Sequence, residues 1–193
     1  MRSALDKLIS GAGFLLATVL LIAAGLLTWA NVFIANEVHD QLSQQNITMP
    51  EKAALETQAQ HDALDQYAGQ PLTTGPQAKA YADFYIAVHM DAMAEGKTYS
   101  EVSGEFTAMT DEQKASPEGQ ALGQVRQSMF MGDTLRGLLL YGFAFATMGT
   151  IALYAAIAAY VGAALMLLLS GLGLRHSRKT ADAPVTRAVP VPA

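Results

Sequence analysis

The stretch from Gly137 to Leu174, GLLLYGFAFATMGTIALYAAIAAYVGAALMLLLSGLGL, decides the fold class of this 193-residue chain. It lies between Arg136 and Arg175 and contains no Asp, Glu, Lys, Arg, His or Pro. A helix that crosses the hydrocarbon core of a bilayer, about 30 Å thick, needs roughly 20 consecutive apolar residues. The stretch therefore predicts an integral membrane protein.

A second apolar run, residues 8–35, begins close to the N-terminus. Arg2 and Lys7 precede it, and it is far longer than the roughly 7–15 residues of a signal-peptide hydrophobic region. Nothing like an Ala-x-Ala cleavage pattern stands at its far end. We therefore expect an uncleaved transmembrane helix over residues 11–35, preceded by a cytoplasmic N-terminus of residues 1–10.

The stretch from Gly137 to Leu174 is too long for one simple crossing, because as a helix it would reach about 57 Å. It could form a hairpin of two short spans, or one continuous helix that lies only partly in the bilayer. There is no Pro, Asn or Asp on which a hairpin could turn. A hairpin would also leave Arg175 outside the cell. We therefore expect a continuous helix, with residues 151–174 in the membrane and residues 136–150 as an apolar extension above it.

Charged residues set the predicted orientation. Basic residues flank the apolar runs at the two ends of the chain, whereas residues 37–133 hold fifteen Asp and Glu against five Lys and Arg, a balance of −10. The positive-inside rule then places both termini in the cytoplasm and residues 36–150 outside the cell membrane. Such an acidic segment also argues against nucleic acid as a partner, because phosphate binding needs a basic surface.

The segment between the spans, residues 36–135, has the patterns of an acidic helical domain. We expect the first helix to run on past Ala35, because no breaker occurs before Gln45. Residues 51–67 are a helix candidate, either continuous or broken, and residues 77–95 carry aromatic residues at helical spacing. The fold class predicted is an all-α membrane protein, with two antiparallel transmembrane helices and a small helical extracytoplasmic domain inserted between them.

Local signals place the ends of several of these helices. Gly96 is placed as a C-cap of the aromatic helix. Thr98 and Thr110 are each followed three residues later by Glu or Gln, which is the pattern of a capping box. Pro117 suits the first turn of a helix that continues into the last span.

Small residues within the two runs have the spacing that lets helices approach closely. They are Gly13, Ala17, Ala152, Ala156, Ala159 and Ala163. Packing of the two spans on each other is the favoured interpretation, and packing on a foreign helix is the alternative. Neither span holds a charged residue at bilayer depth, so a pump or channel formed by this chain alone is not expected.

The extension above the membrane contains apolar side chains that should not face water. The candidate interface residues are Leu138, Leu139, Phe143 and Phe145. They need a cover from the ectodomain, from the continued first helix or from another protein. Beyond the lipid bilayer, the expected partner is therefore a membrane protein or a further copy of the chain.

Residues that could carry chemistry do not form a recognisable motif. His39, His61 and His89 fall on three different predicted helices, with no HxxxH or ExxH spacing. His61 and His89 are the candidate metal ligands, against a solvated-surface interpretation that we favour. The chain has no cysteine, no GxSxG and no GxGxxG, so neither catalytic residues nor a cofactor is predicted.

Four segments resemble a known family. They are Gly75–Asp83 (GPQAKAYAD), Gly96–Ser103 (GKTYSEVS), Met131–Leu139 (MGDTLRGLL) and Ile151–Ala158 (IALYAAIA). The chain resembles small actinobacterial membrane proteins, mostly uncharacterised, some of which are called aromatic ring-opening dioxygenases. The resemblance covers most of residues 8–175. It implies a two-span protein of a Gram-positive envelope and assigns no activity or site residue. Extradiol ring opening uses iron held by two His and one carboxylate, and the histidines here are scattered.

The sequence thus predicts a non-enzymatic envelope protein that docks on another membrane assembly as an accessory or scaffold component. The alternative is a metal-dependent enzyme or ligand-binding sensor built on the ectodomain histidines. A ligand-gated signalling protein is disfavoured, because the expected cytoplasmic tail, residues 175–193, is short and has the Pro- and Ala-rich composition of a disordered segment.

Overall fold

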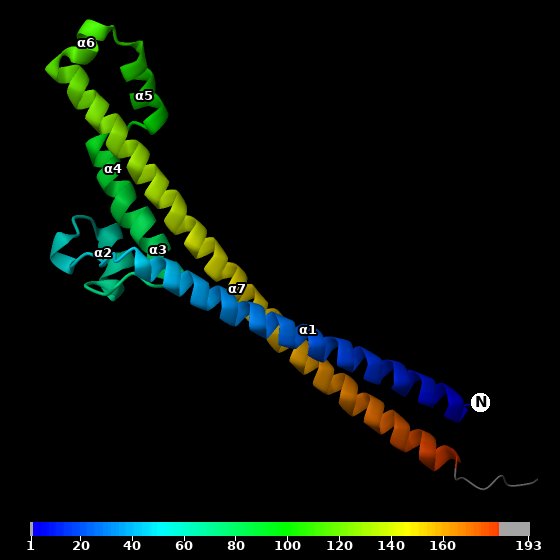
Figure 1. The fold of residues 1–193 in the computed structure, drawn as a ribbon. Coiled ribbons are helices and arrows are strands. Elements are labelled where there is room, and N and C mark those ends of the chain that lie inside the picture. The colour runs from blue at the N-terminus through cyan, green and yellow to red at the C-terminus, as the bar shows by residue number, and fades with distance from the viewer. Residues whose placement is uncertain (1, 182–193) are drawn as a thin grey trace, which may run out of the picture. The chain divides into compact units, whose positions relative to one another are not determined.

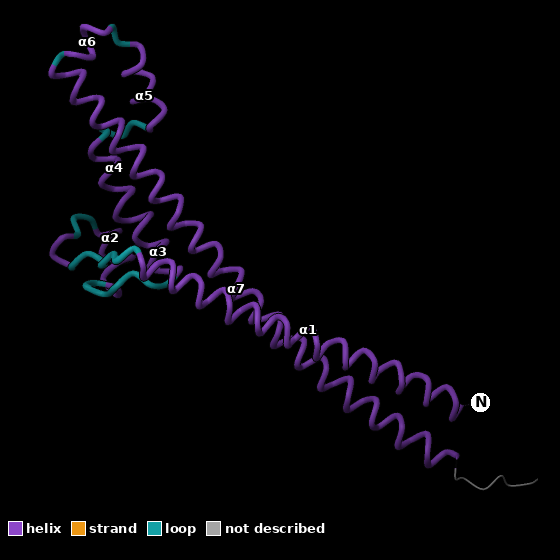
Figure 2. Tube along the Cα trace, viewed as in Figure 1, coloured by secondary structure: helices purple, strands orange, loops and turns teal. Residues whose placement is uncertain are grey.

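The computed structural model describes residues 2–181, and side chains from residue 5 to residue 178; over this range the protein is all-helical (Figures 1 and 2). The elements in order are α1 (Arg2–Gln44), η1 (Lys52–Ala54), α2 (Gln58–Leu64), η2 (Asp65–Tyr67), α3 (Gly75–Tyr81), η3 (Ala82–Ile86), α4 (Ala87–Met93), α5 (Tyr99–Ala108), α6 (Asp111–Ala115) and α7 (Pro117–Ala181).

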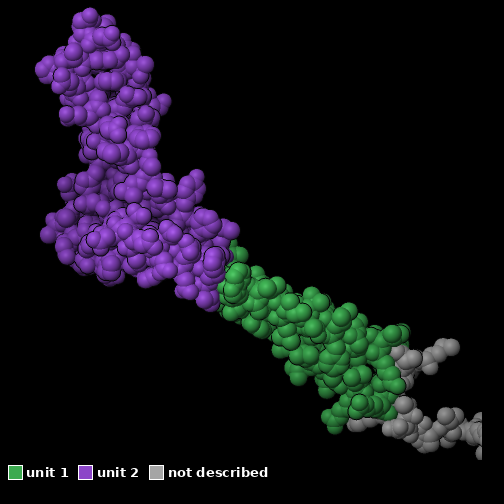
Figure 3. All heavy atoms as spheres, in the orientation of Figure 1, with its two compact units in different colours: residues 1–31, 151–193 green, residues 32–150 purple. Residues whose placement is uncertain are grey.

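Two compact units divide the chain (Figure 3). Unit 1 comprises Met1–Asn31 and Ile151–Ala193, of which residues 2–31 and 151–181 are described. Unit 2 is Val32–Thr150. The helices α1 and α7 each contribute residues to both units.

The helices α1 and α7 are both long and apolar enough to cross a membrane. The stretch from Gly137 to Leu174 lies within α7, which is one unbroken helix, so the hairpin alternative is wrong. The predicted continuation of the first helix past Ala35 is confirmed, because α1 ends at Gln44. The predicted start at Pro117 is also confirmed, and it gives α7 65 residues and a length of about 98 Å.

In unit 1 the two helices meet along a seam of small residues. Side chains buried at seven-residue spacing are Ser10, Ala17 and Ala24 on α1, and Ala156, Ala163, Ser170 and Ser177 on α7. A β-carbon added to Gly13 would meet the Ser170 hydroxyl, and one added to Gly173 would meet the Ser10 hydroxyl. A seven-residue repeat keeps one face of a helix toward its partner, and small residues on that face let the backbones approach.

The outward surface of unit 1 is made of large apolar side chains. Leu8 is 71% exposed, Ile22 60% and Leu168 65%. A contiguous apolar surface of this extent is not tolerated in water, whereas it matches hydrocarbon. Both the seam and the surface fit helices surrounded by lipid.

The C-terminal end of α7 differs from the prediction of a tail disordered from residue 175. The helix continues through Arg175 to Ala181. Basic residues stabilise the last turns of a helix by interacting with its dipole, and no proline occurs between Arg175 and Pro184. The remainder of the predicted tail, residues 182–193, lies outside the described residues.

The main core of unit 2 forms where short helices pack on α1 and α7. Its buried members include Val38 and Leu42 from α1, Leu64 from α2 and Leu139 from α7. The polypeptide between α1 and α3 folds back on itself, as the backbone N–H of Leu72 donates to the carbonyl of Ile47 at 2.9 Å. This segment thereby closes the core beneath α2.

The predicted aromatic helix exists, but it is not regular. The elements α3, η3 and α4 follow one another without a break, and η3 is a π-helical turn. Arg136 of α7 docks on this turn: its Nε donates to the carbonyl of Ala82 at 3.0 Å, and its Nη2 lies 3.5 Å from Asp83. The C-cap of α4 is Ala94, so the prediction of Gly96 as the C-cap is wrong by two residues. Gly96 adopts a φ of +79°, and its N–H bonds the Asp91 carbonyl, which is the outer bond of a Schellman motif.

Four short helices begin with a capping box. The boxes at Thr98 and Thr110 were predicted and are confirmed. Two more, at Thr57 and Thr74, open α2 and α3. The predicted helix over residues 51–67 is broken into η1, α2 and η2, since the box at Thr57 starts a new helix.

A second, smaller core holds α4 and α5 against α7. Met90, Ala94, Val102 and Met129 are its buried members. Next to it, the Phe106 ring lies between Lys114 and Arg126, whose cationic groups are 5.8 and 5.3 Å from the ring centre. Cation–π contacts of this kind help to hold the helices α5 and α6 against α7.

We predict that Gly75→Ala destabilises unit 2. A β-carbon at Gly75 would meet Ala146, the Phe143 α-carbon at 3.2 Å and the Gly142 carbonyl at 3.5 Å, so the backbone of α7 would have to shift. The free energy of unfolding should fall by about 1–3 kcal/mol, as expected for overpacking. Thermal unfolding of the full chain in detergent measures this.

The matched control is Gly104→Ala in α5. Gly104 is exposed, and nothing lies within 4 Å of an added β-carbon. Alanine should stabilise the helix there by roughly 0.5–1 kcal/mol. Equal stability changes in the two variants would contradict the close approach of α3 and α7.

Candidate functional site

An apolar groove in unit 2 is the strongest candidate site. It lies between the segment from Phe33 to Gln45, which is the end of α1 and the turn after it, and α7 from Leu135 to Met148; its volume is about 510 Å³. Ligand sites in proteins are commonly hollows of about 300–1,000 Å³ with predominantly apolar walls. The groove is therefore of the right size and character for a small apolar ligand.

The floor of the groove is built from the core of unit 2. Val38, Leu42 and Leu139 line it and are buried, and Gly142 contributes no side chain. A β-carbon on Gly142 would lie 3.5 Å from the side chain of Leu42, which is an ordinary van der Waals contact. The backbone of α7 at Gly142 therefore lies close to Leu42 of α1. The floor is thus formed by residues that the fold already holds in place.

The two edges of the groove have different chemistry. On α1, Glu37 and Gln41 lie four residues apart on one face of the helix, and Gln45 follows in the turn just beyond its end at Gln44. Nε2 of Gln41 donates to Oε1 of Glu37 at 2.9 Å. The α7 edge carries Leu138, Phe145 and Met148, which leaves it without a polar side chain. One edge is therefore polar and the other apolar.

The structure separates the four predicted interface residues into two pairs. Leu139 is 2% exposed and belongs to the core, and Phe143 is half-buried, with the Lys79 ammonium 5.5 Å from its ring centre. Leu138 is 62% exposed and Phe145 54%. The short helices of unit 2 thus cover one side of this part of α7 and leave the other open.

The open side continues along α7 beyond the predicted residues. Tyr141 and Met148 are also exposed, and together with Leu138 and Phe145 they form a stripe at spacings of three and four residues. We call these four residues the α7 apolar face. Tyr141 and Met148 were not predicted from the sequence, although each lies three residues after a predicted interface residue and therefore on the same side of a helix.

A second hollow, of about 630 Å³, lies between α4, the start of α5 and α7. It contains four charged residues, Asp91, Lys97, Asp133 and Arg136. Lys97 pairs with Glu105 at 2.8 Å, and Arg136 pairs with Asp83 and Asp133. These three residues therefore serve the packing of α5 and α7, which leaves Asp91 as the charged lining residue without an ion pair among the described residues.

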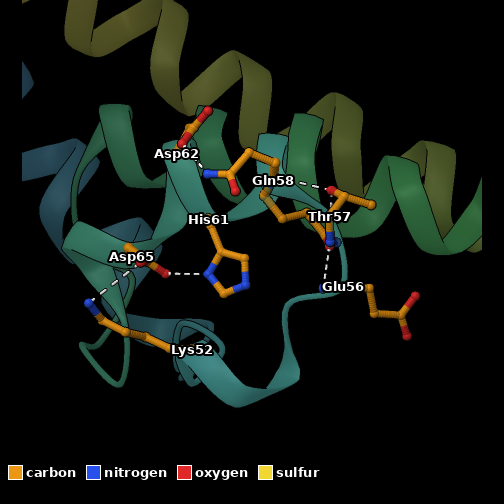
Figure 4. A network of polar contacts seen from close by, with 8 residues as sticks. Lys52, Glu56, Thr57, Gln58, His61, Asp62 and Asp65 are labelled. Carbon is orange, nitrogen blue, oxygen red and sulfur yellow. Dashed lines mark hydrogen bonds and ion pairs between the residues drawn. The ribbon is translucent and has the colours of Figure 1, made fainter.

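His61 takes part in a small polar network on α2 (Figure 4). Its Nδ1 lies 2.9 Å from Oδ1 of Asp65, and Nζ of Lys52 lies 3.6 Å from the other oxygen of Asp65. The hydrogen bond with His61, followed by the Lys52 cation, holds the pKa of Asp65 below its usual value. The network ties η1 to the end of α2.

His89, the other candidate metal ligand, lies in a separate environment. Its Nδ1 bonds the Tyr85 carbonyl at 2.7 Å, and its ring contacts that of Tyr85. The structure therefore does not bring His61 and His89 into one site. Over the described part of the chain, no group of three or more His, Cys, Asp or Glu side chains is arranged to hold a metal ion.

The six predicted packing residues all lie in unit 1. Ala17, Ala156 and Ala163 are buried in the seam, and Gly13, Ala152 and Ala159 are half-buried. They serve contacts between α1 and α7, and they mark no ligand position.

Comparison of the chain with protein-family models, curated proteins and solved structures gives no match. Its class is therefore defined by the structure alone: an all-helical protein with two helices that could span a membrane.

We predict that the purified protein carries no stoichiometric metal. His61 and His89 are engaged with separate partners, and metal affinity needs converging ligands. Elemental analysis of the wild type and of a His61→Ala, His89→Ala double variant should therefore give the same background. One equivalent of metal in the wild type that is lost in the double variant would contradict this.

Proposed function

We propose that this chain is a non-enzymatic integral membrane protein that docks on another membrane component through the α7 apolar face. The observation that carries the proposal is the exposure of Leu138, Tyr141, Phe145 and Met148 on a helix segment outside the proposed span, residues 151–174. Exposed apolar patches on such a scale mark interaction surfaces.

An antiparallel arrangement of the two spans forms part of the proposal. Four contact pairs in unit 1 support it: Ser10 with Gly173, Gly13 with Ser170, Leu20 with Gly162, and Thr28 with Tyr160. Residue numbers rise along α1 as they fall along α7. Two such spans place both termini on the same side of the membrane.

The charge distribution supports a cytoplasmic location of both termini. Arg2 and Lys7 precede the first span, and Arg175, Arg178 and Lys179 follow the second, while residues 37–133 carry a balance of −10. Residues 36–150 would then form the extracytoplasmic part. The resemblance of four segments to two-span actinobacterial proteins agrees with this topology.

The apolar face has a neighbour that rules out simple burial in lipid. At the same level of unit 2, where Leu42 lies against Gly142, α1 exposes Asp40 and Gln44 to its surroundings and carries Glu37 at the edge of the groove. Hydrocarbon around α7 would also surround these polar groups, at high cost. A protein partner that contacts α7 alone avoids this cost.

We expect single cysteines to report the topology, because the natural chain has none. A membrane-impermeant maleimide should label Ser100→Cys in intact cells and should label Arg178→Cys only after the membrane is opened. Both positions are exposed, so access to reagent is decided by the membrane. Labelling of Arg178→Cys in intact cells would overturn the two-span topology.

We expect a photo-reactive phenylalanine analogue at Tyr141 to cross-link to a protein neighbour in native membranes. The matched control is the same analogue at Gln44, which is exposed on the polar side of α1. Mass spectrometry identifies the adduct as another protein or a second copy. The docking proposal would be refuted if no adduct formed at Tyr141 and the protein purified in mild detergent had the mass of a monomer.

A further inference from the structure

We propose that the groove between α1 and α7 in unit 2 binds one acyl chain of a membrane lipid whose head group carries an amine, and that Glu37 receives this amine. The inference deepens the proposed function and rests on it for one point, the position of the groove next to the bilayer. The acyl chain would fill the groove between α1 and the residues of the α7 apolar face that line it.

The shape of the groove selects a single chain over a helix. The groove follows α1 from Phe33 to Leu42, nine residue steps that span about 14 Å, and ends at Gln45 just beyond the helix. A helix with its side chains is about 10–12 Å wide, whereas this hollow holds only about 510 Å³ along that length. A long, narrow volume with a floor of Val38, Leu42 and Leu139 suits a flexible hydrocarbon chain.

The asymmetry of the two edges matches the asymmetry of a lipid. The α7 edge offers Leu138 and Phe145 to methylene groups. The α1 edge offers a carboxylate and two amides, which are the groups that bond an ammonium and ester or phosphate oxygens. An apolar ligand without a polar head would leave that row of polar groups unused.

The charge of the rim selects an amine among lipid head groups. Glu37 contributes the negative charge of the groove, and in the described range it has no ion pair; its contact is with the neutral amide of Gln41. No Lys or Arg lines the groove. An anionic head group would therefore meet like charge at the rim, whereas an ammonium would complete a charge-assisted hydrogen bond.

The α1 side of unit 2 offers an apolar approach to the groove. Val32 and Phe33 are exposed five and four residues before Glu37, and no charged residue lies between them and Glu37. An acyl chain that follows α1 from the end of the first proposed span, residues 11–35, therefore meets no charged residue before Glu37.

Quenching of tryptophan fluorescence by brominated acyl chains tests the inference in the full-length protein. The natural Trp29 is first replaced by Phe, and a new tryptophan is placed either in the groove wall, Leu138→Trp, or beside it, Tyr141→Trp. Leu138 and Tyr141 are similarly exposed, at 62% and 67%, but only Leu138 lines the groove. Each protein is reconstituted in vesicles with brominated phosphatidylethanolamine or brominated phosphatidylglycerol.

We expect strong quenching of Leu138→Trp in phosphatidylethanolamine, at least several-fold weaker quenching in phosphatidylglycerol, and little quenching of Tyr141→Trp in either. Adding Glu37→Gln should remove the difference between the two lipids at Leu138→Trp. Equal quenching at both positions, no quenching at Leu138→Trp, or a lipid preference unchanged by Glu37→Gln would each overturn the inference.

Cross-linking at Tyr141 tests the docking proposal independently of the lipid site. Quenching at Leu138→Trp without cross-links would leave the lipid site standing and remove the docking partner. Cross-links to a second copy or to another protein, combined with an unquenched Leu138→Trp, would retain docking and refute the lipid site.

Discussion

The length of α7 is the constraint on which the rest of the structure depends. At about 98 Å it is roughly three times as long as the hydrocarbon core of a bilayer is thick. A helix cannot shorten itself, and this one contains no break, so its apolar side chains beyond one crossing must be covered by something else. The short helices of unit 2 and the C-terminal part of α1 supply that cover on one side.

Arg136 marks the point at which this covering begins. It stands directly before the uncharged stretch, and it bonds the carbonyl of Ala82 within the π-helical turn η3. The Ala82 carbonyl also accepts the backbone N–H of Ala87, so the guanidinium uses its second lone pair and adds a charge-assisted hydrogen bond between α7 and this turn. Gly75 completes the same junction, since its missing side chain lets the start of α3 approach the backbone of α7. These two contacts press the aromatic helix against the extension and bury Leu139.

Because the short helices cover α7 from one side only, one side of this part of α7 is buried and the other is exposed. Phe143 and Leu139 point into the domain, whereas Leu138 and Phe145, only a fraction of a turn away, do not. The proposed docking surface and the proposed lipid groove both follow from this incomplete coverage. The two surfaces share Leu138, Phe145 and Met148, which line the groove and also belong to the α7 apolar face, whereas Tyr141 belongs to the face alone.

The sequence by itself determined the helical class, the continuity of α1 and α7 and two of the four capping boxes. These are local properties, set by uninterrupted apolar runs, by the absence of breakers and by Thr-x-x-Glu or Thr-x-x-Gln spacing. The boxes at Thr57 and Thr74 carry the same signal and could have been found from it.

Only the tertiary structure decided which apolar side chains are covered. Leu138 and Leu139 are adjacent and chemically identical, yet one is exposed and the other buried. Whether each is buried depends on where α1 and α3 lie around α7. A helix that is apolar on all sides has no sequence pattern that indicates which side will be covered. The same reason explains why the groove could not be predicted: its edges come from segments about a hundred residues apart, which meet only through the fold.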